Sequence, residues 1–129
     1  MRTVNKIRHK VTEIWIDEEG ILILKCVTEE EIDLEEVTKC FETYKSLGIG
    51  PNNKVLQLID ARIGSAMPSD ARAYAAENGK DFFIASAIVN DSLAVKLLVN
   101  FFNNFYKQLV PFKMFSTEEA ARKWLNTFR

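Results

Sequence analysis

The spacing of apolar residues predicts an N-terminal hairpin. Over residues 11–17 apolar side chains alternate with acidic ones, as in a strand with one buried face. The turn at 17–20 ends on Gly20, a residue that tolerates positive φ, and residues 21–27 supply an apolar return strand. Residues 1–10 show no usable period, and we assign them only as an N-terminal arm or an extra strand.

Three further strands are predicted from short apolar runs at residues 55–59, 83–89 and 112–115. Runs that are almost continuously apolar are typical of strands covered on both faces. The first run ends at Asp60 and continues into a polar loop and then a helix, in the sequence KVLQLIDARIGSAMPSDAR. Because open α/β sheets bind ligands beyond the carboxyl ends of their strands, this loop is a natural place for a site.

Four helices are predicted between and after these strands. The first begins after Asp33, which we prefer to Thr28 as its N-cap because the apolar stripe starts only beyond it. Pro68 is placed to open the second helix in its first turn, and a capping box of Ser116 and Glu119 precedes the last helix. The last helix carries an apolar stripe formed by Ala121, Trp124, Leu125 and Phe128.

The third predicted helix, residues 94–108, is more apolar than one packing surface requires. Its polar residues share one narrow stripe, and the apolar remainder is wider than the roughly 100° face that a surface helix buries. The helix is either enclosed by its own domain or in contact with a protein partner, a second copy of the chain or an apolar ligand. The residues expected to line such an interface or pocket are Phe82, Phe83, Phe101, Phe102, Phe105 and Tyr106.

The predicted order of elements is β-β-α-β-α-β-α-β-α. A hairpin followed by three βα crossovers gives a mixed sheet with parallel C-terminal strands, covered by helices. Residues 1–129 contain no linker, repeat or low-complexity segment, which predicts a single α/β domain.

Charge and composition narrow the classes of function. The 17 basic and 18 acidic residues nearly cancel, so no overall field recruits nucleic acid or an anionic membrane surface. No apolar run is long enough to span a bilayer and no apolar leader is present, which predicts a cytoplasmic protein. Cys26 and Cys40 lie among apolar residues without metal-ligand spacing, which predicts core thiols and no metal or other cofactor.

The loop after the strand at 55–59 holds the candidate polar site. Asp60 and Arg62 are suited to bind a polar group at the strand end, or Asp60 instead bonds to loop N–H groups and holds the turn. Ser65 and Ser69 lie near a helix start, where a phosphate would meet free N–H groups and the positive end of the dipole. The alternative is that either serine only caps the helix.

Catalysis has little support in the sequence. His9, the only histidine, lies in the unassigned arm, so a Ser-His or Cys-His pair would need that arm folded over a distant site. Carboxylates are paired only in the acid-rich stretch 29–36, where solvent would leave them ordinary. We therefore expect a protein without enzymatic activity.

The order of elements and three segments resemble the SpoIIAA-like branch of the STAS superfamily, named after sulfate transporters and anti-sigma-factor antagonists. The segments are VLQLIDARIGSAMPSDAR, ASAIVNDSLAVKLLVNFF and FSTEEAARKWL, and the resemblance spans about residues 11–128. It implies a SpoIIAA-like fold and a non-enzymatic switch or interaction module, whereas a related fold in the SEC14 group binds lipids in an apolar pocket. The Asp-Ser-Ser-Gly motif that carries the phosphorylated serine of the antagonists is absent, because this chain has Asp60-Ala61-Arg62-Ile63-Gly64-Ser65 there.

Two classes of function remain. The first is a regulatory protein-interaction module that binds a protein partner or forms a homodimer. The second is a carrier or sensor of a lipid or other apolar small molecule. A closed pocket of about 300 Å³ or more between the third helix and the sheet would favour the second class. A flat exposed apolar patch would favour the first.

Overall fold

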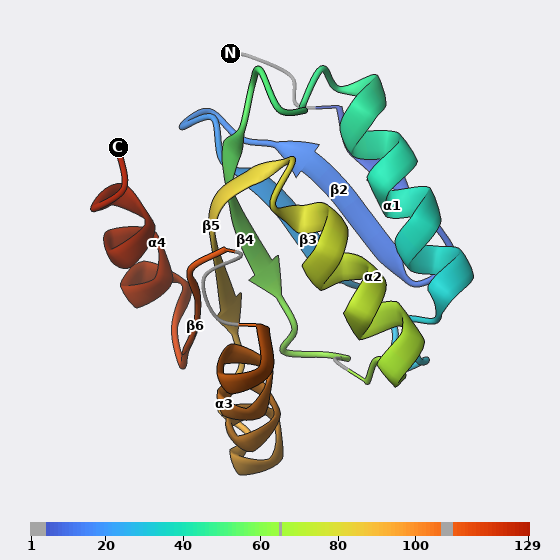
Figure 1. Cartoon of the computed structure of the whole chain (residues 1–129), viewed down its shortest axis with the longest axis vertical. Helices are drawn as coiled ribbons and strands as arrows, with labels where there is room; N and C mark the ends of the chain where they lie inside the picture. The colour runs from blue at the N-terminus through green and yellow to red at the C-terminus, as the bar shows by residue number, and fades with distance from the viewer. Residues whose placement is uncertain (1–4, 65, 107–109) are drawn as a thin grey trace.

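The computed structural model describes residues 5–64, 66–106 and 110–129, and for residues 98 and 101–106 it describes the backbone alone. Within these residues the chain forms six strands and four helices (Figure 1). The strands are β1 (Ile7–Arg8), β2 (Thr12–Ile16), β3 (Leu22–Cys26), β4 (Val55–Asp60), β5 (Phe83–Val89) and β6 (Phe112–Phe115). The helices are α1 (Leu34–Ser46), α2 (Ser69–Gly79), α3 (Leu93–Tyr106) and α4 (Glu118–Asn126).

The strands form one mixed sheet whose spatial order follows the chain from β1 to β6. Strands β1, β2 and β3 pair antiparallel, whereas β3, β4, β5 and β6 pair parallel. The predicted hairpin and parallel crossovers are therefore confirmed. The segment 1–10, which had no usable period, contributes the short edge strand β1, paired with β2.

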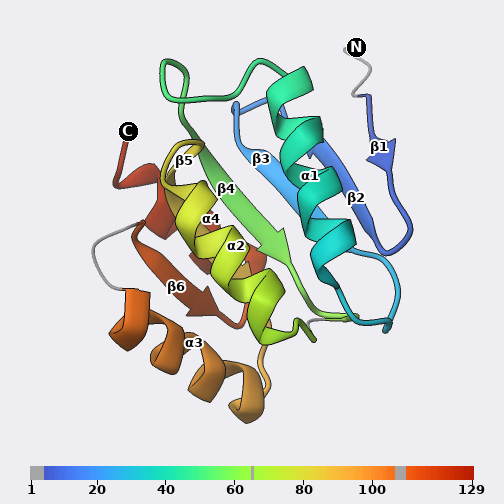
Figure 2. The ribbon, with the colours of Figure 1, turned by 45° about the vertical axis from the view of Figure 1, so that its right-hand side comes forward.

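Helices cover both faces of the sheet. In Figure 2, α1 and α2 lie in front of the sheet and α4 lies behind it. Helix α3 lies beside β6, and its Val95 and Val99 line a cavity together with residues of α1 and α2. Three helices therefore share one face, and α4 covers the other.

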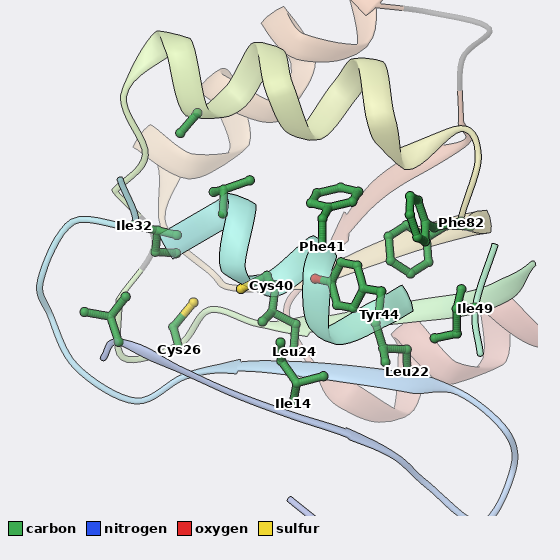
Figure 3. Packing of buried hydrophobic residues seen from close by; sticks show 14 of the residues in the cluster. Ile14, Leu22, Leu24, Cys26, Ile32, Cys40, Phe41, Tyr44, Ile49 and Phe82 are labelled. Atoms are coloured by element: carbon green, nitrogen blue, oxygen red, sulfur yellow. The ribbon is translucent and has the colours of Figure 1, made fainter. Parts of the chain in front are cut away.

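The larger core lies between the sheet and helices α1 and α2 (Figure 3). Phe41 is its central ring, and it meets four other aromatic rings edge to face, with centroids 5.0 to 6.5 Å apart. These rings belong to Tyr44, Tyr74, Phe82 and Phe83. Edge-to-face pairs of this kind add to the gain from burial alone, so this cluster fixes how α1 and α2 sit on the sheet.

The second core lies under α4. Ala121 and Leu125 have no exposed surface and pack against small and branched residues of β3, β4 and β5. Trp124, which the sequence placed on the same stripe, is partly buried at the edge of this core and contacts the rings of Phe115 and Phe128. The packing of α4 therefore centres on Leu125.

The helix starts follow the predicted capping chemistry with one correction. Asp33 caps α1, its Oδ1 accepting a hydrogen bond from the Glu36 N–H at 2.9 Å, as predicted. The cap of α4 is Thr117, so the prediction of Ser116 was one residue early. The Asn90 N–H donates to the Phe115 carbonyl, which keeps the chain extended to the end of β6 and delays the helix.

Glycine is required at two of the chain reversals. Gly20, in the turn between β2 and β3, has φ of 79°, and Gly48, which follows α1, has φ of 85°. Residues that carry a side chain rarely adopt such positive φ values, so the prediction that Gly20 closes the hairpin is confirmed.

Pro68 serves as the N-cap of α2, one position before the expected first turn. The end of the third helix predicted at residue 108 lies outside the described residues.

Arg122 ties α4 to the turn between β2 and β3. Its guanidinium lies 2.8 Å from Asp17 Oδ2 and 2.9 Å from Glu19 Oε1, and its Nε lies 2.9 Å from Glu118 Oε2. Burial is the largest single influence and lowers the pKa of the guanidinium, but the hydrogen bonds that Arg122 donates to Glu118 and Asp17 outweigh it, so the pKa is raised. This network fixes the C-terminal helix against the first hairpin.

Candidate functional site

The first candidate site lies where β4 ends, and its two charged residues bind each other. Arg62 donates from Nε to Asp60 Oδ1 at 2.9 Å and from Nη2 to Asp60 Oδ2 at 2.7 Å. Its backbone N–H also donates to Asp60 Oδ1. The Arg62 side chain bond is the main cause that lowers the pKa of the Asp60 carboxyl. Binding of a polar ligand by this pair stays a prediction.

We expect Arg62→Gln to destabilise the protein at pH 7 and to have a smaller effect at pH 3. Because the folded-state pKa of Asp60 is lowered, the pair stabilises the fold above the unfolded pKa of about 4, and this stability is lost as pH falls through the folded value. Urea denaturation at the two pH values measures the difference. The contribution is modest because Arg62 is 55% exposed.

Lys39→Gln is the matched control, since Lys39 forms an exposed ion pair with Glu35 on the surface of α1. Its effect should stay within about 0.5 kcal/mol at pH 7. An Arg62→Gln effect that is the same at pH 3 and pH 7 would mean that the Asp60 pair does not act through its charge.

The loop that follows β5 is held by the side-chain amide of Asn90. Asn90 donates from Nδ2 to the Ala61 carbonyl at 2.6 Å and accepts from the Ser92 N–H at 2.7 Å, so it joins the loops after β4 and β5. This bond joins residues 29 positions apart, so no local pattern in the sequence indicates it. Ser69 is the exposed first residue of α2, and Ser65 lies outside the described residues, so phosphorylation of either stays a prediction.

An apolar cavity of about 170 Å³ lies between the sheet and helices α1, α2 and α3. Among the residues predicted to line such a pocket, Phe83 does so, whereas Phe82 is buried in the adjoining core. The side chains of Phe101, Phe102, Phe105 and Tyr106 lie outside the described residues. Ligand binding by these residues stays a prediction.

Polar groups line two parts of this cavity. On its sheet side, Ser86 Oγ donates to Gln57 Oε1 at 2.8 Å, and Gln57 Nε2 donates to the Tyr44 hydroxyl at 3.3 Å. Burial raises the pKa of Tyr44, so the phenol stays neutral. On α2, the half-buried Arg72 also lines the cavity and donates to the Met67 carbonyl. These four side chains come from four elements, and no local pattern predicts that they would meet at one cavity.

The other face of α3 is open to solvent. Leu93 is 70% exposed and Leu97, one turn later, is 61% exposed. Ala94 between them is also exposed, whereas Val99 on the cavity side is buried. We call Leu93, Ala94 and Leu97 the outer face of α3. This outer face is an apolar patch on the described surface.

Two cysteine thiols and one histidine ring are the side chains considered for nucleophilic catalysis. Burial raises the pKa of Cys26 and of Cys40 to about 12, so both free thiols stay protonated near neutral pH. His9 Nε2 lies 2.7 Å from Thr43 Oγ1, and among the described residues no carboxylate orients the other ring nitrogen. Within the same residues no group of three His, Cys, Asp or Glu side chains could hold a metal, and no helix is long and apolar enough to cross a membrane.

The predicted SpoIIAA-like fold is confirmed by comparison with solved structures. A similar solved structure is that of an uncharacterized protein from the DUF3478 family with a SpoIIAA-like fold, from Shewanella loihica PV-4. The two share 17% identity with a TM-score of 0.64, over 95% of this chain and 92% of that chain, which shows the fold alone. The chain belongs to the DUF7793 family, a domain of unknown function, whose model matches residues 14–129. No curated protein matches it.

Proposed function

We propose that this chain is a non-enzymatic, regulatory interaction module of the cytoplasm that binds a second copy of itself through the outer face of α3. The observation that carries the proposal is the exposure of Leu93 and Leu97 on a helix whose opposite side already packs over the cavity. An apolar surface on one side of an otherwise docked helix is typical of a contact with another protein.

Charge supports a second copy as the partner. The three residues of the outer face, Leu93, Ala94 and Leu97, are uncharged, and Lys96 is the one charged residue in the sequence of α3. The chain as a whole has a net charge of −1, which does not oppose self-association. A patch of this kind can meet an identical patch across a two-fold axis, the commonest arrangement of soluble oligomers.

The proposal predicts that Leu97→Asp dissociates the dimer. Leu97 is exposed in the single chain, so aspartate is hydrated there and the fold is retained, but its charge loses that hydration on association. We expect the dimer dissociation constant to rise by a factor of about 10 or more, which corresponds to about 1.4 kcal/mol. Size-exclusion chromatography with light scattering measures the mass, and circular dichroism verifies the fold.

Asn52→Asp is the matched control, because it adds the same charge at an exposed position of the loop between α1 and β4, away from α3 (Figure 1). It should leave the dimer intact. Equal dissociation by both variants would point to a general charge effect, and no dissociation by Leu97→Asp would contradict an interface on the outer face of α3.

A second candidate function is the binding of an apolar small molecule, and the cavity under α1, α2 and α3 favours it. At about 170 Å³ the cavity is smaller than the 300 Å³ or more typical of sites for drug-sized ligands. A carrier of a whole lipid is therefore less well supported than a sensor of a small compound. This function and self-association through α3 are compatible, since Val95 and Val99 line the cavity while Leu97 belongs to the outer face.

A further inference from the structure

We infer that the cavity under α1, α2 and α3 binds a small monocarboxylic acid, with Arg72 as the partner of its carboxylate. The apolar body of this acid is about the size of one aromatic ring. This inference deepens the second candidate function, the binding of an apolar small molecule, and rests on it. It does not depend on whether α3 joins two copies of the chain.

The volume of the cavity sets the size of the ligand. A dry, apolar cavity of about 150 Å³ in another protein accepts a benzene molecule, and the cavity here measures about 170 Å³. It therefore has room for one ring or a short chain of equal volume. A sterol or a lipid with two acyl chains is excluded by size unless the helices move apart.

Arg72 is the one cation that lines the cavity, and it lacks a carboxylate partner within the described part of the chain. Its guanidinium donates to the Met67 carbonyl, whereas Arg62 and Arg122 each bind carboxylates. A guanidinium has five N–H donors in a planar fork, so donors remain for a carboxylate. One positive charge matches a monoanion better than a phosphate, which carries nearly two charges at neutral pH.

The rest of the lining indicates that the ligand has only one polar end. Tyr44, Gln57 and Ser86 bond to one another, so these side chains do not need a second polar group on the ligand. The remaining wall is apolar, with Phe41 and Phe83 on one side and Val99 of α3 on another. An uncharged ring or chain fills this space, and its carboxylate reaches Arg72, which is half-buried and therefore near solvent.

Phenylacetate and its neutral analogue phenylacetamide test the inference, because the two have nearly the same shape. Each is titrated into the full chain, and chemical-shift changes in heteronuclear NMR spectra report affinity and location. Arg72→Gln removes the charge, and Lys80→Gln removes a charge from the residue that follows α2 and serves as the control. Ala75→Leu places extra volume in the cavity wall and should block it.

We expect phenylacetate to bind at least about 10-fold more tightly than phenylacetamide, since only the carboxylate forms charge-assisted hydrogen bonds that match the guanidinium fork. Arg72→Gln should remove this preference, Lys80→Gln should leave it unchanged, and Ala75→Leu should abolish binding of both compounds. The amide spectra verify that each variant is folded.

The contrary results are distinguishable. If both compounds bind equally and Arg72→Gln changes nothing, while Ala75→Leu blocks both, the cavity binds apolar molecules but the carboxylate assignment is wrong. If neither compound binds, or if binding persists in Ala75→Leu, the inference and the second candidate function lose their support together.

Discussion

Phe41→Ala should lower the free energy of unfolding by about 3 to 5 kcal/mol, the range for loss of a fully buried aromatic side chain. Phe41 is 5% exposed and is the ring that Tyr44, Tyr74, Phe82 and Phe83 all contact. Its removal joins the space left behind to an existing cavity that Phe41 already lines, so the neighbours cannot collapse fully into it. Because domains are stable by only about 5 to 15 kcal/mol, this is a large fraction of the total.

Urea denaturation followed by circular dichroism measures the loss. Glu42→Ala, at the neighbouring exposed position of α1, is the control and should change stability by no more than about 0.5 kcal/mol. A loss below about 1 kcal/mol for Phe41→Ala would mean that α1 and α2 are not joined through this ring.

Leu125→Ala should cost about 2 to 5 kcal/mol, because Leu125 is completely buried under α4. The effect reports on the opposite face of the sheet from Phe41, where Leu125 belongs to the second core together with Leu58 and Ala87. The two losses should therefore be close to additive in the double variant, as expected for separate sites without shared contacts.

Lys123→Ala changes an exposed residue of the same helix and is the control for effects of alanine on helix propensity and of the lost surface charge. Guanidinium denaturation of the two single variants and the double variant gives the coupling between the two cores. A Leu125→Ala loss below about 1 kcal/mol would show that α4 is not docked on the sheet as described.

The fold was predictable because its local signals agree. Gly20 closes the first hairpin, Asp33 caps α1, and the apolar runs at β5 and β6 have the predicted boundaries. Each of these signals depends on a few neighbouring residues. The cap of α4 was placed one residue early because Ser116 and Thr117 are equally suitable by type, and the choice between them depends on a hydrogen bond between Asn90 and Phe115.

The site was less predictable because its contacts join distant residues. Glu36 appeared to be one of several solvated acids at a helix start, yet it is 5% exposed and accepts from Val11 N–H and Thr12 Oγ1. The place of Arg72 in an apolar cavity likewise depends on how α1, α2 and α3 meet, which no local pattern indicates. The width of the apolar stripe of α3 is a local property of the sequence, and the interface that it predicts stays a prediction.

Native mass spectrometry of the wild-type protein at micromolar concentration tests the central claim most directly, because it reports the oligomeric state and any bound ligand in one spectrum. If the outer face of α3 joins two chains, the principal species will have twice the mass of the 14.8 kDa chain. A spectrum that contains only the monomer, without a bound molecule, would contradict this account of the protein as a self-associating module.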